Sequence, residues 1–219
     1  MHYLLTHLET AWALTIVHLR LSLIPIVLGL LIAVPLGALV WPRPRLRRLT
    51  SVTASIIFTI PSLALFVVLP LIIPTRILDE ANVIIALTLY TVALLVRAVP
   101  EALDAVPEQT RAAAAAIGYT RLGELLKVEL PLSLPVLIAG VRVVAVTNIS
   151  MVAVGSVIGI GGLGTWFTEG YQADKSDQII AGIIVVFLLA IVIDVLIMLI
   201  GRQITPWTRM ATRSAGMPA

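Results

Sequence analysis

Two ionisable residues lie inside long apolar stretches of the sequence, and they are the first candidates for chemistry. Arg142 is the one charged residue in 135–158, and Asp194 is the one charged residue in 179–200. A charge in lipid-like surroundings is costly and usually faces a partner of opposite sign. On two antiparallel helices both side chains would lie roughly 10 Å from the same end. We therefore predict an intramembrane ion pair, with separate snorkelling of the two side chains to the interface as the alternative.

Residue types that support catalysis or metal binding are otherwise sparse. Histidine occurs at His2, His7 and His18, and cysteine is absent, so disulfides and thiolate metal sites are excluded. His7 and His18 have no third ligand nearby, which argues against a metal site. The sequence lacks a GxxxxGK[ST] phosphate loop, an HExxH motif and a Ser/His/Asp set in its polar segments. We expect no catalytic residue, no cofactor and no metal in this chain.

A glycine-rich segment follows the apolar stretch that ends at residue 158. Gly159-Ile-Gly161-Gly-Leu-Gly164 matches the pattern GxGxxG, which binds dinucleotides only between a strand and a helix. Because an apolar stretch of membrane-spanning length precedes it here, we reject a nucleotide site and predict a turn that re-enters or caps a helical bundle. Gly155 and Gly159 also have the spacing that lets membrane helices pack closely.

The composition indicates that the solvent of this chain is lipid. Of its 219 residues, 59% are apolar and 12% are charged, whereas a soluble domain is about half apolar and a quarter charged. The net charge of +3 comes from arginines and lysines between the apolar stretches rather than from a basic face with aromatic residues. That placement is typical of membrane topology, so nucleic-acid binding is not expected.

Five segments approach or exceed the roughly 20 apolar residues that a membrane-spanning helix needs. They are residues 21–40, 51–73, 82–99, 135–158 and 179–200. We predict an all-α, polytopic membrane bundle of about five transmembrane helices, formed by one domain over 1–210 and followed by a flexible cytoplasmic tail at 211–219. The segment 4–19 is predicted to lie on the membrane surface or dip into it, and the first residues do not resemble a cleaved signal peptide.

Arginine and lysine are distributed unevenly between the two sides of this arrangement. Eleven lie on one side, namely Arg43, Arg45, Arg47, Arg48, Arg97, Arg111, Arg121, Lys127, Arg202, Arg209 and Arg213, and three on the other, namely Arg20, Arg76 and Lys175. Short cytoplasmic loops carry the excess of positive charge. The sequence therefore predicts an external N-terminus, with the segments near 41–50 and 100–131 and the C-terminus in the cytoplasm.

The segment 100–131 is the most informative of the predicted cytoplasmic loops. Ala112–Ala116 has high helix propensity, Gly118 interrupts it, and a second helical stretch ends before Pro131. A simple connector would need only a few residues. We therefore predict an ordered helix–turn–helix that serves as a docking surface.

This segment resembles the EAA loop of the permeases of ABC importers, written EAA-x3-G-x9-I-x-LP. Ala113, Ala114, Gly118, Leu130 and Pro131 match the pattern, Val128 replaces Ile conservatively, and Ala112 stands where the family usually has Glu. The resemblance implies that the loop couples the chain to an ATPase through Ala112, Ala113, Ala114, Gly118, Leu130 and Pro131.

The resemblance covers the chain from about residue 12 to 210. Within the family, the chain most resembles the permeases of osmoprotectant importers, which carry glycine betaine, choline, carnitine or proline. This resemblance rests on the segments 59–65, 127–135, 160–164, 168–170 and 205–207. Methionine and other amino-acid permeases share the EAA loop and the Gly-Gly-Leu-Gly turn. An amino-acid or methionine-type importer is therefore the alternative.

The resemblance also implies the partners of the chain. They are two cytoplasmic ATP-binding subunits, a second identical or homologous permease, and an extracytoplasmic solute-binding protein, assembled in a prokaryotic inner or plasma membrane. ATP would be hydrolysed in the separate subunits, so this chain is not expected to be an enzyme.

Few polar residues occur within the predicted spans. We predict that Thr59, Ser62, Thr147, Asn148 and Ser150 line the translocation pathway; hydrogen bonding to the backbone or to neighbouring helices is the alternative. An intramembrane enzyme would need a catalytic set that is missing. A standalone secondary transporter fits poorly with five short spans that show no inverted repeat.

Overall fold

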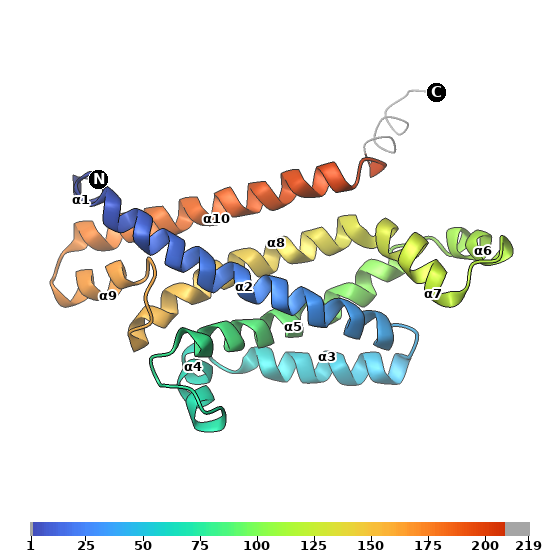
Figure 1. Ribbon diagram of the computed structural model, residues 1–219, viewed down its shortest axis with the longest axis horizontal. Helices are drawn as coiled ribbons and strands as arrows, with labels where there is room; N and C mark the ends of the chain where they lie inside the picture. The colour runs from blue at the N-terminus through green and yellow to red at the C-terminus, as the bar shows by residue number, and fades with distance from the viewer. Residues whose placement is uncertain (1, 209–219) are drawn as a thin grey trace.

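The computed structural model describes residues 2–208, except for the side chain of His2, and they form an all-α bundle (Figure 1). The long helices are α2 (Leu8–Val40), α3 (Pro44–Thr59), α4 (Ser62–Ile72), α5 (Glu80–Asp104), α8 (Leu130–Gly155) and α10 (Ser176–Ile204). The short helices are α1 (His2–Thr6), α6 (Glu108–Ala116), α7 (Arg121–Glu124) and α9 (Thr165–Gln172). A π-helical turn, η1 (Leu125–Glu129), joins α7 to α8, and a 3-10 turn, η2 (Ser156–Ile158), follows α8. The predicted tail at 211–219 lies outside the described residues.

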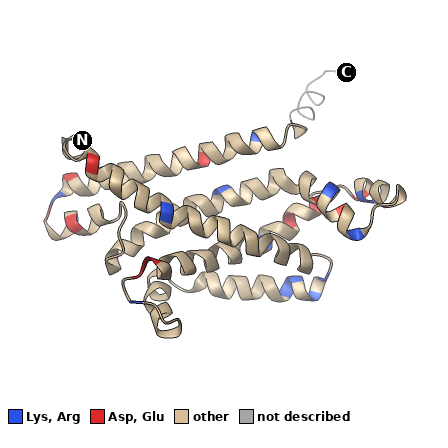
Figure 2. Cartoon of the chain, viewed as in Figure 1, with Lys and Arg blue, Asp and Glu red and all other residues tan. Residues whose placement is uncertain are grey.

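Four helical segments are long and apolar enough to cross a membrane, and a bent pair of helices makes a possible fifth. The four are α2, α5, the continuous segment Arg121–Ile158 and α10, and the bent pair is α3 with α4. Figure 2 shows that the middle of the long helices carries few charged residues. The predicted all-α bundle with about five candidate spans is confirmed.

The second predicted span, at 51–73, differs from a single helix. It is divided into α3 and α4, whose axes are bent by 100°. Ile60 and Pro61 have extended backbones at the break, because proline disfavours a helical conformation in the residue before it and lacks an amide hydrogen itself. The hydroxyl of Tyr90 donates a hydrogen bond of 2.5 Å to the carbonyl of Ile60. The bend is therefore supported from α5.

The surface segment predicted at 4–19 is not separate from the first span. Residues 8–40 form one helix, because neither proline nor glycine occurs before Pro25. Its 33 residues correspond to about 50 Å, which exceeds the ~30 Å hydrocarbon layer. The helix therefore tilts or extends beyond the hydrocarbon at one end or both.

Helix α5 forms the centre of the bundle, in contact with α2, α3, α4 and α8. Small residues allow its closest approach to α2. A Cβ atom added at Gly29 would lie 2.1 Å from Cγ2 of Thr91, and one at Gly37 would lie 2.6 Å from Cβ of Val99. Close contacts at small residues let membrane helices associate by van der Waals packing, because lipid provides no hydrophobic driving force between them. Helix α10 lies at the edge of the bundle, with only 6% of its most apolar stretch buried, so much of its surface is left for lipid or another chain.

The two ends of the bundle contain different segments. The turn between α2 and α3, the segment α6–α7 and the C-terminal end of α10 lie at one end, and α1 and α9 lie at the other (Figure 1). We call the first the hairpin end, because the two short helices α6 and α7 form a helical hairpin there.

Candidate functional site: the helical hairpin between α5 and α8

The helical hairpin consists of α6, a turn around Gly118, and α7 with η1. The alanine-rich sequence favours the first helix, and Gly118 ends it with a positive φ of 91°. The amide of Tyr119 then donates to the carbonyl of Ala114 at 3.2 Å, which is the pattern of a glycine-terminated helix. The hydroxyl of Thr120 accepts from the amide of Gly123 at 3.2 Å and so caps α7. The helix–turn–helix expected from the sequence is present.

Glycine is required at position 118 by the backbone conformation there, and not because a side chain would lack room. A Cβ atom at this position would have no neighbour within 4 Å. A positive φ is nevertheless strained for residues with a side chain, and most of all for β-branched ones. Replacements at Gly118 therefore act on the angle between the two hairpin helices without creating a clash.

Arg111 connects the hairpin to the rest of the bundle. Its Nη2 donates to the carbonyl of Val106 at 2.6 Å and to that of Leu103 at 3.4 Å, so its charge lies at the C-terminal end of α5, where cations are stabilised by the helix dipole. Its guanidinium carbon lies 5.1 Å from the ring centroid of Trp41, which is within the range of a cation–π contact. One side chain on α6 thus contacts the ends of α2 and α5.

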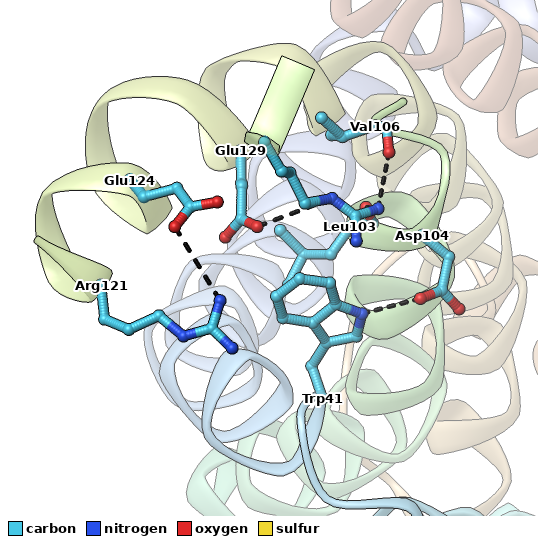
Figure 3. Close-up of polar contacts among 8 residues, drawn as sticks. Trp41, Leu103, Asp104, Val106, Arg121, Glu124 and Glu129 are labelled. Atoms are coloured by element: carbon cyan, nitrogen blue, oxygen red, sulfur yellow. Dashed lines mark hydrogen bonds and ion pairs between the residues drawn. The ribbon is translucent and has the colours of Figure 1, made fainter. Parts of the chain in front are cut away.

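Two acidic residues complete this network (Figure 3). Trp41 donates from Nε1 to Asp104 at 2.7 Å, and the other carboxylate oxygen of Asp104 lies 2.7 Å from Nη1 of Arg47. The carboxylate of Glu129 is buried, with 2% of its side chain exposed, and its Oε1 lies 3.7 Å from Nε of Arg111. That distance exceeds a direct hydrogen bond, and both atoms lack one among the described residues. Glu129 therefore neutralises Arg111 by charge rather than by a close contact.

The outer surface of the hairpin includes an apolar patch that no other part of the described residues covers. Exposed side chains there are Ile117, Tyr119, Leu122 and Leu126. A hollow of about 490 Å³ separates the hairpin from the α2–α3 turn and is lined by Trp41, Pro42, Glu108, Arg111, Ala112, Ala115, Arg121 and Glu124. An exposed apolar patch beside polar groups is typical of a protein interface.

The residues predicted to couple to an ATPase differ in their location and in their exposure. Ala112, Ala113 and Gly118 are exposed on the hairpin, and Ala114 is buried beneath them. Leu130 and Pro131 are half-buried at the start of α8, where they join the hairpin to the long helix. Only the first three are therefore placed to touch a partner directly.

The structure brings Arg142 and Asp194 together between α8 and α10. Nε and Nη2 of Arg142 donate to the two carboxylate oxygens of Asp194, each at 2.7 Å. The two side chains remain 37% and 28% exposed. A bidentate contact of this kind fixes the relative position of the two helices as well as neutralising the charges.

The five residues predicted to line a pathway do not form one surface. Asn148 is fully buried and donates to the hydroxyl of Thr91 at 3.0 Å. Thr59 and Thr147 donate to carbonyl oxygens of their own helices, and Ser62 lies half-buried at the start of α4. Ser150 is exposed and lines a cavity of about 930 Å³.

That cavity lies at the end opposite the hairpin, among α8, η2, α9 and α10. Its lining is Ser150, Ala153, Val154, Ser156, Val157, Gly159, Phe167, Thr168, Tyr171, Gln172 and Ile179. It combines two aromatic rings with hydroxyl and amide groups and contains no charged side chain. Such a surface suits a small solute better than it suits a metal or an anion.

The glycine segment 159–164 caps the same end and packs on His18. Nδ1 of His18 accepts from the amide of Leu163 at 3.2 Å, and Nε2 lies 2.9 Å from the carbonyl of Ile149, so the proton is assigned to Nε2. Gly159 and Gly162 have φ values of 79° and 107°. A Cβ atom at Gly162 would lie 3.2 Å from Nδ1 of His18.

Sequence reasoning missed several residues that the structure places in the network under the hairpin. Trp41 and Glu129 are distant from Arg111 in the sequence, Asp104 lies seven residues before it, and no local pattern relates these three residues to Arg111. The one signal for a buried partner was indirect. Glu129 is an acidic residue directly before α8, at a position where the start of an apolar helix would favour an apolar residue. His18 was considered only as a metal ligand, and the structure gives it a role in holding the glycine turn.

Comparison with known proteins identifies the family of the chain. Residues 14–210 match the family described as binding-protein-dependent transport system inner membrane component. The chain is 36% identical over 210 residues to the osmoprotectant import permease protein OsmW of Salmonella typhimurium, covering 94% of this chain and 96% of that protein. It is 33% identical to the choline transport system permease protein OpuBB of Bacillus subtilis, covering 94% and 95%.

A solved structure gives the same result at the level of the fold. A chain of the inward-facing MetNI methionine ABC transporter superimposes with a TM-score of 0.75 at 25% identity, covering 94% of this chain and 98% of that one. The family match and the near full-length relatives agree with the helical arrangement described above. The chain therefore belongs to the binding-protein-dependent inner membrane components, the transmembrane permeases of ABC importers.

Proposed function

We propose that this chain is the permease of an importer for small compatible solutes of the glycine betaine, choline, carnitine or proline type. The observation that carries the proposal is the near full-length similarity to permeases of osmoprotectants and of choline. The cavity at Ser150 supports it, because aromatic rings with neutral polar groups suit a compact cation or zwitterion. On this proposal, the cavity is part of the pathway, which a second identical or homologous permease completes.

The hairpin is the proposed docking site for the ATPase. Its exposed apolar side chains would be covered by a cytoplasmic ATP-binding subunit, one for each permease. Arg111 would transmit the position of the hairpin to the ends of α2 and α5 through the contacts described above. This assignment places the hairpin end in the cytoplasm and α1 and α9 outside, where a solute-binding protein would deliver its cargo.

The solute is tested by uptake in a bacterial strain that lacks its own osmoprotectant and methionine importers. The chain is expressed together with its cognate ATPase and binding protein, and radiolabelled glycine betaine, choline, carnitine, proline and methionine are compared. We expect uptake of at least one of the first four. Uptake of methionine alone would support instead a methionine-type importer, which the likeness to MetNI makes the second candidate.

The docking surface is tested by co-purification. Ile117→Ser combined with Leu122→Ser removes two exposed apolar side chains from the hairpin, and we expect less ATPase to be retained by the tagged permease. Tyr171→Ser is the matched control, because that side chain is 83% exposed at the opposite end. Equal retention of the ATPase by the wild-type chain, the double variant and the control would rule the hairpin out as the docking surface.

A further inference from the structure

One face of α3 carries two arginines followed by an exposed apolar stripe. At about 100° per residue, Arg45, Arg48, Leu49, Val52 and Ile56 lie within roughly 100° of one another around the helix. Leu49, Val52 and Ile56 are 62%, 52% and 61% exposed. The buried Ala54 lies on the opposite face, which packs against α5. The stripe therefore points away from the bundle.

The four arginines at this end of α3 differ in their partners. Arg47 lies on the inner face and pairs with Asp104, and Arg43 donates to the carbonyl of Leu39 at 2.8 Å. Arg45 and Arg48 are exposed, and neither has a hydrogen bond or ion pair within residues 2–208. The first turn of α3 contains no acidic residue. Two positive charges on the outward face thus remain without an anion.

We propose that this face binds an anionic phospholipid, with the phosphate headgroup between Arg45 and Arg48 and an acyl chain along Leu49, Val52 and Ile56. The distance from Arg45 to Ile56 along the helix is about 16 Å, close to half of a ~30 Å hydrocarbon layer. One lipid of one leaflet therefore matches the length of the stripe. Figure 2 shows the basic residues at the end of α3 beside the α2–α3 turn, and Figure 1 shows α3 running along α5 at the edge of the bundle.

Charge complementarity favours a lipid over a second copy of this chain. A copy of the chain would have to present an acidic group to the two arginines beside an apolar surface. Anionic lipids supply a phosphate and an acyl chain in one molecule, and clustered basic residues at the end of a membrane helix attract them. The inference is independent of the solute and of the ATPase, because it depends only on the membrane location of the chain and on a face of α3 that no second copy covers.

The purified chain in neutral detergent is titrated with phosphatidylglycerol or phosphatidylcholine of identical acyl chains, and bound lipid is counted by native mass spectrometry. We expect preferential retention of phosphatidylglycerol. Each arginine near an anionic headgroup contributes about fivefold in affinity. Arg45→Gln with Arg48→Gln should weaken phosphatidylglycerol binding on the order of 25-fold and leave phosphatidylcholine binding unchanged.

The matched control removes the same charge from the same end of the bundle. Arg121→Gln with Lys127→Gln should leave the preference for phosphatidylglycerol intact. An equal loss in this control would show that net charge alone attracts the lipid, and it would overturn the site. Displacement of the lipid by an equal concentration of inorganic phosphate would overturn the lipid assignment, because the apolar stripe would then contribute nothing.

The alternative occupant is tested in the membrane itself. The chain has no cysteine, so Val52→Cys introduces a single thiol in the middle of the stripe. A face covered by lipid should give no disulfide between two copies under mild oxidation. Efficient formation of that disulfide would show that a second copy covers α3, and the lipid proposal would then be wrong.

Discussion

The guanidinium of Arg142 and the carboxylate of Asp194 form two parallel hydrogen bonds of 2.7 Å between α8 and α10. Among the four unbroken spans, α10 has the smallest buried share in its most apolar stretch, 6%, and apart from its contacts with α1 and α9 it is joined to the bundle mainly along α8. The ion pair is therefore a specific element of an otherwise apolar helix–helix contact.

Disruption of this pair should be non-additive. Arg142→Met or Asp194→Leu alone leaves one charge without its partner, and each should reduce the yield of folded protein in detergent. The double variant removes both charges, so it should recover part of the loss. Size-exclusion yield measures the effect, and losses that simply add would mean that the two side chains act separately.

The ion pair is one of the structural features that could be predicted from the sequence. Matching depths in two antiparallel spans were enough to expect Arg142 beside Asp194, and the alanine run before Gly118 was enough to expect the hairpin. The network around Arg111 was not predictable, because its partners come from three separate segments whose ends meet only in the folded chain. The bend at Pro61 was missed because proline is tolerated within membrane spans, so its presence alone does not indicate a break.

Gly118 should be sensitive to β-branching and tolerant of asparagine. Gly118→Val forces a side chain into a positive φ at a cost of roughly 1–2 kcal/mol, which should reorient the hairpin and reduce ATPase association without preventing membrane insertion. Gly118→Asn is the control, because asparagine tolerates positive φ better than other residues with side chains. Co-purified ATPase gives the comparison, and full retention with valine would show that the angle of the turn does not matter for docking.

The orientation can be determined with single cysteines, since the native chain has none. A cysteine at Asp174, in the exposed connection between α9 and α10, should react with an impermeant maleimide added to intact cells. A cysteine at Arg45 should react only after the membrane is opened. Labelling of Arg45→Cys from outside would reverse the orientation and remove the basis for a cytoplasmic hairpin.

His18 should be replaceable by glutamine but not by leucine. His18→Leu leaves the amide of Leu163 and the carbonyl of Ile149 without their partner, at about 1–3 kcal/mol for each buried group. Glutamine has both a donor and an acceptor, so it can restore part of the arrangement. Protease sensitivity of the segment 159–164 in membranes reports the difference, and indistinguishable digestion of the two variants would argue that His18 does not hold the turn.

The continuity of α2 has a mechanical consequence. His18 holds the glycine turn at one end of the bundle, and Trp41 contacts Arg111 at the other. They are separated by 23 residues of sequence, about 35 Å along a helix. One continuous helix therefore joins the two contacts, and Pro25 and Pro35 within it are the positions where it can bend. A displacement of the hairpin would reach the glycine turn through this helix, reduced by any bending at the two prolines.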